Sequence, residues 1–186
     1  SAFSNAGQRC ASGSRIIIYN EIYDEFVGML IERTKGLKLG NLNDDDFGPV
    51  INKKQLENMV SMLDKAKEGG AKILIGGKRK KGKKYNKGFY MEPTLVTDVT
   101  SKDDISNYEL FGPIACLYRV DNYDEALELA NDSPYGLTGS IHTKDFDTAY
   151  NFMHNIQAGV AVVNAGTFGS EPHMPFGGVK LSGNGT

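Results

Sequence analysis

Residues 15–31 read RIIIYNEIYDEFVGMLI, and this stretch decides the fold class that the sequence predicts. Its β-branched opening, residues 15–19, predicts a short strand. Asn20 is expected to cap a helix directly after it, because apolar residues such as Ile22 and Phe26 then recur at helical spacing. A strand followed at once by an amphipathic helix is typical of folds in which helices connect parallel strands.

The same alternation continues along the chain. Asn52, with Gln55 three residues later, is a variant of the capping box and opens a second helix that Gly69 and Gly70 end. We therefore predict one α/β domain over residues 1–186, built mostly on a parallel sheet flanked by helices. The other elements expected are strands over 71–75, 89–96, 114–120, 137–142 and 160–163, the last of them buried, and helices over 126–131, opened by Asn122 and Glu125, and over 146–156.

Composition limits the classes of function. With 40% apolar residues, 24% charged residues and a net charge of -2, the chain has the composition of a soluble globular protein. It contains no run of 18 apolar residues and no signal-peptide pattern, so neither a membrane nor a secretory pathway is expected. The two cysteines form no CxxC pair, which favours a reducing compartment, the cytoplasm. No metal-binding spacing such as HExxH occurs, so no metal site is expected.

Residues 78–87, KRKKGKKYNK, carry seven of the 21 basic residues. Such a tract either contacts phosphate or nucleic acid, or forms a solvated loop between two strands. We favour the loop, because only one aromatic residue and no groove-entering helix accompany the charges. No nucleic-acid partner is expected.

Cys10, in the segment FSNAGQRC, is the candidate nucleophile. A free thiol is only a few per cent thiolate near neutral pH, so a nucleophilic cysteine needs nearby backbone N–H groups or charges that stabilise the anion. Gly7 permits such close approach of the backbone. The alternative is a small buried hydrophobe, but Arg9 and nearby serines argue against a sealed core position. Cys116 lies in an apolar stretch and is expected to be buried and inert.

Three segments, taken together and in order, resemble signatures of the aldehyde dehydrogenase superfamily. Residues 3–15 match FxNxGQxCxxxxR, residues 109–113 match E-x-FGP, and residues 175–185 match PFGGxKxSGxG. One such match would be weak, whereas three in register are very specific. Neither GxGxxG nor GxxxxGK[ST] occurs, so no phosphate loop of the usual kind is present. The resemblance covers essentially the whole chain and implies the catalytic-domain fold of that family.

The resemblance implies the C-terminal, catalytic half of an enzyme that oxidises a small aldehyde to a carboxylic acid with NAD or NADP. In the family a cysteine thiolate attacks the aldehyde to form a thiohemiacetal, hydride leaves to the cofactor, and water hydrolyses the thioester. By that likeness Cys10 is the nucleophile, and its backbone N–H donates to the developing oxyanion. Glu109 corresponds to the carboxylate that holds the nicotinamide ribose, Phe111 packs near the nicotinamide, and Gln55 matches a less well defined ribose contact.

Substrate choice is weakly encoded. Family tunnels are lined by residues beside the nucleophile and by the loop before PFGG, which correspond here to Arg9, Ala11 and residues 167–174. Phe176 resembles a tunnel-lining aromatic, with packing support as the alternative. Arg9 and His173 favour a carboxylate-bearing semialdehyde, and the alternative for each is an ordinary solvated side chain.

The chain also departs from the family pattern. The general-base glutamate, the asparagine that donates to the oxyanion, the nucleotide-binding domain and the C-terminal arm are not found within residues 1–186. The resemblance therefore implies a chain that does not turn over alone and that belongs to a homodimer or homotetramer at full length. Two alternatives stay open: a cysteine hydrolase with a histidine base near Cys10, and a non-catalytic domain of the same fold.

Overall fold

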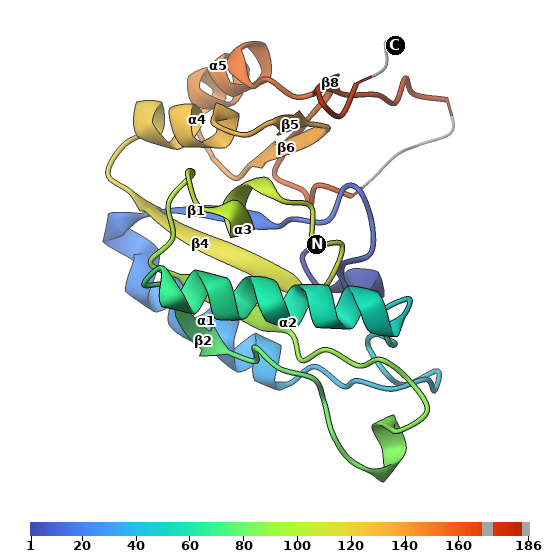
Figure 1. Cartoon of the computed structure of the whole chain (residues 1–186). Helices are drawn as coiled ribbons and strands as arrows, with labels where there is room; N and C mark the ends of the chain where they lie inside the picture. The colour runs from blue at the N-terminus through green and yellow to red at the C-terminus, as the bar shows by residue number, and fades with distance from the viewer. Residues whose placement is uncertain (169–172, 184–186) are drawn as a thin grey trace.

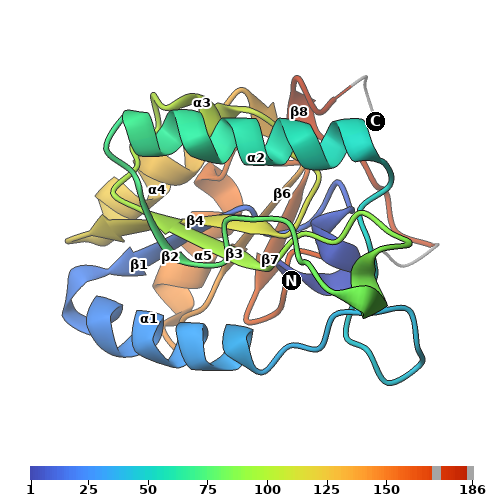
Figure 2. The same ribbon diagram turned by 60° about the horizontal axis from the view of Figure 1, so that its bottom comes forward.

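The computed structural model describes residues 1–168 and 173–183, and its larger part is a sheet between two helices (Figure 1). The sheet has four strands in the order β1 (Arg15–Tyr19), β4 (Ile114–Val120), β3 (Thr94–Thr97) and β2 (Lys72–Ile75). β1 and β3 run parallel to β4, whereas β2 pairs antiparallel with β3. Figure 2 shows α1 (Asn20–Lys35) and α2 (Lys53–Glu68) on opposite faces of this sheet. The predicted α/β class with a mostly parallel sheet is confirmed.

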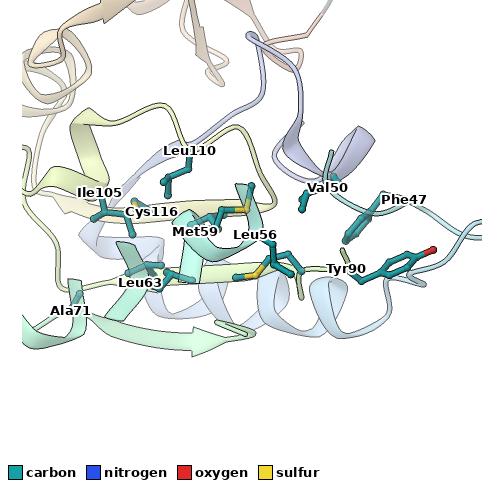
Figure 3. Packing of buried hydrophobic residues seen from close by; sticks show 14 of the residues in the cluster. Phe47, Val50, Leu56, Met59, Leu63, Ala71, Tyr90, Ile105, Leu110 and Cys116 are labelled. Atoms are coloured by element: carbon teal, nitrogen blue, oxygen red, sulfur yellow. The ribbon is translucent and has the colours of Figure 1, made fainter. Parts of the chain in front are cut away.

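The central strand β4 divides the core into two clusters because successive side chains of a strand point to opposite faces. Its Cys116 and Tyr118 pack in one cluster with residues of α2, among them Met59 and Leu63 (Figure 3). Its Leu117 belongs to the other cluster, which contains residues of α1. A strand buried on both faces needs a continuous apolar run, which is what residues 114–118 supply.

A second group of elements follows β4 and lies beyond the β1 edge of the sheet, at the top of Figure 1. Within it β6 and β7 form a parallel pair in the register Thr138↔Val160, and β5 and β8 form an antiparallel pair. The elements of this group are α4 (Tyr123–Asn131), β5 (Tyr135–Gly136), β6 (Thr138–Ile141), α5 (Phe146–Asn155), β7 (Val160–Val163) and β8 (Val179–Lys180). Three short helical turns that the sequence did not predict complete the described chain: η1 (Ser4–Gly7), η2 (Lys83–Tyr85) and α3 (Asp104–Asn107).

Two predicted helix caps form as expected. The Oδ1 atom of Asn52 accepts a hydrogen bond of 2.8 Å from the backbone N–H of Gln55, and α2 ends at Gly69. The Oδ1 atom of Asn122 accepts one of 2.9 Å from the backbone N–H of Glu125. The reciprocal half of the capping box at α2 was predicted wrongly, because the Gln55 side chain donates instead to the backbone carbonyl of Leu110.

Three further expectations need correction. Tyr19, not Asn20, is the N-cap of α1, and the Asn20 side chain instead accepts a hydrogen bond of 2.8 Å from Arg119. The strand expected over 89–96 begins only at Thr94, since Pro93 has no backbone N–H to give to a sheet.

The strand expected to be buried over 160–163 is β7, whose residues are half-buried or exposed. It is an edge strand of a two-stranded sheet, whereas β4 has a neighbouring strand on each side. The basic tract 78–87 lies in the connection between β2 and β3, as the loop interpretation predicted. Over residues 1–168 and 173–183, no helix has the length and apolar character that crossing a bilayer requires.

Candidate active site

A cleft of about 440 Å³ opens between the four-stranded sheet and the second group of elements, a volume within the usual range for ligand pockets. The first motif contributes Arg9 and Cys10 to its wall, and the second contributes Glu109 and Phe111. The opposite wall includes Thr138 of β6 and other residues from that second group. Two motifs that are far apart in the sequence therefore line one cavity.

The loop before Cys10 has an unusual backbone. Asn5, Ala6 and Gly7 all adopt left-handed conformations, with φ values of 55°, 54° and 67°. This region costs an L-residue roughly 1–2 kcal/mol but is open to glycine. Gly7 is required for a second reason: a Cβ atom there would lie 2.0 Å from the carbonyl oxygen of Gly112. The loop of the nucleophile thus touches the loop of the second motif through backbone atoms.

Gln8 ties this loop to the segment before α2. Its Oε1 accepts a hydrogen bond of 2.8 Å from the backbone N–H of Ile51, and its Nε2 donates to the carbonyl of Pro49 at 3.2 Å. The same Nε2 donates to the carbonyl of Asn5 at 3.3 Å. The sequence identified Gln8 only as a motif position, because nothing local in the chain indicates partners 41 and 43 residues away.

Cys10 follows at a turn in which the N–H of Ser12 donates to the carbonyl of Arg9 at 3.0 Å. Cys10 is exposed and forms part of the cleft wall, so the interpretation of Cys10 as a small buried hydrophobe is wrong. Ala11 is buried, and its carbonyl accepts a hydrogen bond of 2.6 Å from the Thr167 hydroxyl. An exposed thiol on an anchored loop can reach a molecule in the cleft.

The second motif alternates between core and cleft. Leu110 is buried in the cluster of Figure 3, and Glu109 and Phe111 on either side of it are exposed and line the cleft. Phe111 has a left-handed φ of 50°, and Gly112 after it packs against Met59. The buried leucine therefore anchors the loop, while its neighbours present a carboxylate and an aromatic ring to the cavity.

Gln55, a predicted ribose contact, is half-buried at the start of α2 and is not among the residues of the cleft wall. Its side-chain amide donates a hydrogen bond to the backbone carbonyl of Leu110. The ribose contact stays a prediction.

The predicted substrate residues are spread out. Arg9 lines the cleft, and its guanidinium lies 5.5 Å from the centre of the Phe168 ring. Ala11, His173 and Phe176 do not form part of the cleft wall; the first is buried and the other two are exposed. Residues 169–172 of the expected tunnel loop and Gly185 of the third motif lie outside the described residues.

The third motif packs against the second group of elements through glycines. A Cβ atom at Gly159 would lie 1.9 Å from the carbonyl oxygen of Gly177, and one at Gly183 would lie 2.1 Å from that of Gly178. The Lys180 ammonium donates to the carbonyl of Asn131 at 2.5 Å. Within the described residues, the glycines of the third motif thus allow backbone segments to pack closely against one another.

Arg15, the last residue of the first motif, links the two groups of elements. Its guanidinium donates to the Leu129 carbonyl at 2.9 Å and lies 5.2 Å from the centre of the Tyr118 ring.

Cys116, on the same strand as Tyr118, is only 2% exposed, and burial raises the pKa of its thiol to about 12. Its predicted burial is confirmed, and a thiol in that state is unreactive at neutral pH.

Within residues 1–168 and 173–183, no group of three or more His, Cys, Asp or Glu side chains is arranged to hold a metal ion.

Comparison with known proteins agrees with the three motifs. The profile described as "Aldehyde dehydrogenase family" matches residues 1–186. The alpha-ketoglutaric semialdehyde dehydrogenase of Bacillus subtilis is 40% identical over 183 residues, which are 97% of this chain and 38% of that protein. The 1-pyrroline-5-carboxylate dehydrogenase of Staphylococcus aureus is 40% identical over 185 residues, 98% of this chain and 35% of that protein.

A solved structure extends the likeness to three dimensions. The betaine aldehyde dehydrogenase of Staphylococcus aureus, crystallised in complex with NAD+, superposes with a TM-score of 0.91 at 37% identity and covers 95% of this chain and 35% of that chain. The chain thus spans a little over a third of the length of these relatives. With a profile that matches every residue and a fold shared at this level, the chain belongs to the aldehyde dehydrogenase family.

Proposed function

We propose that this chain is the catalytic part of an NAD- or NADP-dependent aldehyde dehydrogenase in which Cys10 is the nucleophile. The observation that carries the proposal is the common cleft: the exposed thiol of Cys10 and the carboxylate of Glu109 line the same cavity. A nucleophile and a ribose-binding group must lie together if a substrate carbon is to meet a nicotinamide ring.

The residues of the cleft fit the nicotinamide end of such a cofactor. The Glu109 carboxylate is exposed and has the acceptor capacity for both vicinal hydroxyls of a ribose. Phe111, 39% exposed in the same wall, offers an aromatic surface to the ring. The relative from Staphylococcus aureus that shares this fold was solved with NAD+. When bound, NAD or NADP supplies the hydride acceptor.

Cys10 performs the covalent chemistry in this proposal. Its thiolate forms a C–S bond to the aldehyde carbon, and the carbonyl electron pair moves to oxygen to give a thiohemiacetal. The backbone N–H of Cys10 stabilises that oxyanion, and a donor of this kind is typically worth about 3 kcal/mol. Loss of hydride leaves a thioester on Cys10, and water then cleaves the C–S bond to release the carboxylic acid and the thiol.

We further propose an aldehyde that carries a carboxylate. Arg9 lies in the cleft wall next to Cys10, and its planar guanidinium group is of a kind well suited to bind a carboxylate. The two relatives from Bacillus subtilis and Staphylococcus aureus are named for alpha-ketoglutaric semialdehyde and 1-pyrroline-5-carboxylate, both acidic compounds.

The test of the reaction uses the natural polypeptide that contains residues 1–186. A simple aldehyde is supplied as the substrate, and the formation of NADH or NADPH is followed by absorbance. The Cys10→Ser substitution is expected to abolish this formation. Retained turnover in Cys10→Ser would remove Cys10 from the role. The cysteine-hydrolase alternative predicts ester hydrolysis without cofactor and no reduced nucleotide, and the non-catalytic alternative predicts neither activity.

The substrate class is tested with Arg9→Ala. We expect kcat/KM to fall at least tenfold for a four-carbon aldehyde acid and to change little for the uncharged aldehyde of the same length. Arg9→Lys keeps the charge and is the matched control, with an intermediate loss. Equal effects of Arg9→Ala on the two substrates would contradict the proposal.

Assembly and location complete the proposal. We infer that the full-length protein is a homodimer or homotetramer. We also infer that it is located in the cytoplasm. Cys10 and Cys116 are both free thiols, and a reducing compartment keeps the Cys10 thiol available for reaction. Light scattering of the natural polypeptide gives the mass of the assembly directly, and a monomeric mass would contradict the oligomer.

A further inference from the structure

One short segment contacts both loops of the candidate site, although it belongs to none of the three motifs. Residues 49–55 lead into and begin α2. On one side the Gln8 side chain of the nucleophile loop binds the N–H of Ile51 and the carbonyl of Pro49. On the other side the Gln55 side chain donates to the carbonyl of Leu110, the residue directly after Glu109.

The segment itself is firmly anchored. Val50 is 2% exposed, and its N–H donates to the carbonyl of Phe89 at 2.9 Å. Asn52 caps α2 through the backbone N–H of Gln55. Figure 3 shows Val50 and Leu110 in the same packed cluster. Displacing the segment would expose apolar surface and break a helix cap, so it is a stable reference for both loops.

The two loops also touch directly, and the contacts act in opposite senses. Backbone atoms of Gly7 and Gly112 are so close that the loops cannot approach further. The hydrogen bonds between Gln8 and residues 49 and 51, and the bond from Gln55 to the Leu110 carbonyl, tie each loop to segment 49–55 and so resist separation of the loops. The backbone contact and the hydrogen bonds together fix the distance between the loop of Cys10 and the loop of Glu109.

We propose that Gln8 and Gln55 are positioning residues that set the distance between the Cys10 thiol and the Glu109 carboxylate through segment 49–55. The inference rests on the proposed function, because that distance matters only if a substrate on Cys10 must meet a cofactor on Glu109. Misplacement of reacting groups by about 1 Å is enough to cost on the order of a hundredfold in rate. For the loss of one amide link, which leaves the other contacts in place, we expect about tenfold.

The experiment is a double-mutant cycle in the natural polypeptide that contains this chain, with Gln8→Ala, Gln55→Ala and the double variant. Each single variant is expected to lower kcat/KM for the aldehyde about tenfold at saturating NAD or NADP, where the loss of a ribose contact of Gln55 alone would not lower it. The double variant is expected to lose far less than a hundredfold, since either substitution already frees the loops from their common reference. Losses that multiply, or single variants with unchanged kcat/KM, would overturn the proposal.

A second readout does not need turnover. The rate of Cys10 alkylation by iodoacetamide should change at least threefold in Gln8→Ala and stay unchanged in Gln55→Ala, because Gln8 hydrogen-bonds the nucleophile loop to segment 49–55 and Gln55 does not contact that loop. An unchanged rate in Gln8→Ala overturns the role of Gln8 even in an inactive protein. Absence of aldehyde-dependent NADH formation in the unmutated protein would instead refute the proposed function.

Folding is controlled in two ways. Gln8→Glu keeps the acceptor for the Ile51 N–H and loses the donor, so it should fold and show a smaller defect than Gln8→Ala. Asn155→Ala removes a side-chain amide of α5 that donates to the Asn151 carbonyl at 2.8 Å and hydrogen-bonds to neither loop, so it should leave kcat/KM unchanged. A defect in Asn155→Ala as large as that in Gln8→Ala would show a general response to amide loss and contradict the proposal.

Discussion

Gly7 lies directly against the backbone of Gly112: a Cβ atom at Gly7 would be 2.0 Å from the Gly112 carbonyl oxygen. The contact joins the loop that carries the exposed thiol to the loop that carries the Glu109 carboxylate, with no side chain between them. Gly7 also has a φ of 67°. Space and backbone conformation therefore both require glycine here.

Gly7→Ala should consequently lower the free energy of unfolding by about 2–5 kcal/mol, from the left-handed conformation and the overlap together. Urea denaturation followed by circular dichroism measures this loss. Gly28→Ala is the matched control, because no atom lies within 4 Å of a Cβ at Gly28 in α1. Alanine should stabilise that helix by about 0.5–1 kcal/mol. Equal stability of the two variants would contradict the account of the Gly7 contact.

The two cysteines should differ sharply in reactivity. Cys10 is exposed, whereas Cys116 is 2% exposed with a pKa raised by burial to about 12. At pH 8 a thiol with that pKa is thiolate in only about one molecule in ten thousand. Mass spectrometry after brief treatment with iodoacetamide should therefore find one label per chain, on Cys10, and a second only in denaturant. Equally slow labelling of both would favour the non-catalytic domain.

Cys116 also makes stability depend on pH in the alkaline range. Its folded-state pKa of about 12 lies above the ordinary value of 9.0, so the folded protein keeps a proton that the unfolded chain releases. The stabilisation is complete below pH 9 and declines as pH rises toward 12, with a slope of up to about 1.4 kcal/mol per pH unit. Denaturation curves between pH 8 and 11 should show a shallower decline for Cys116→Ala than for the unmutated chain. Parallel curves would contradict the assignment.

Glu109→Ala should weaken the binding of the cofactor more than the attack of the thiol. We expect the KM for NAD or NADP to rise at least tenfold in the natural polypeptide, because in the proposed ribose contact the carboxylate accepts two hydrogen bonds that alanine cannot accept. Cys10 alkylation should be unaffected. Glu57→Ala removes an exposed carboxylate of α2 that pairs with Lys53, and serves as the control with unchanged KM. Unaltered cofactor affinity and hydride-transfer rate in Glu109→Ala would refute the ribose assignment.

Local patterns predicted local structure well and failed where a remote partner intervened. Asn52 and Asn122 cap helices as expected, since a cap needs only the next three residues. Asn20 was placed one residue wrongly because Arg119, 99 residues away, binds its side chain. Gln55 was expected to close a capping box and instead binds Leu110, 55 residues away.

The amino-acid sequence alone determined the α/β class, the burial of Cys116 and the three motifs that mark Cys10 and Glu109. Each of these depends on residue type and on spacing within a short stretch. Only the tertiary structure decided that both residues line one cleft, that Gln8 reaches the segment before α2, and that Gln55 of α2 reaches Leu110. These contacts join positions 41 to 55 residues apart, and such partners are set by how the whole chain packs rather than by any local periodicity.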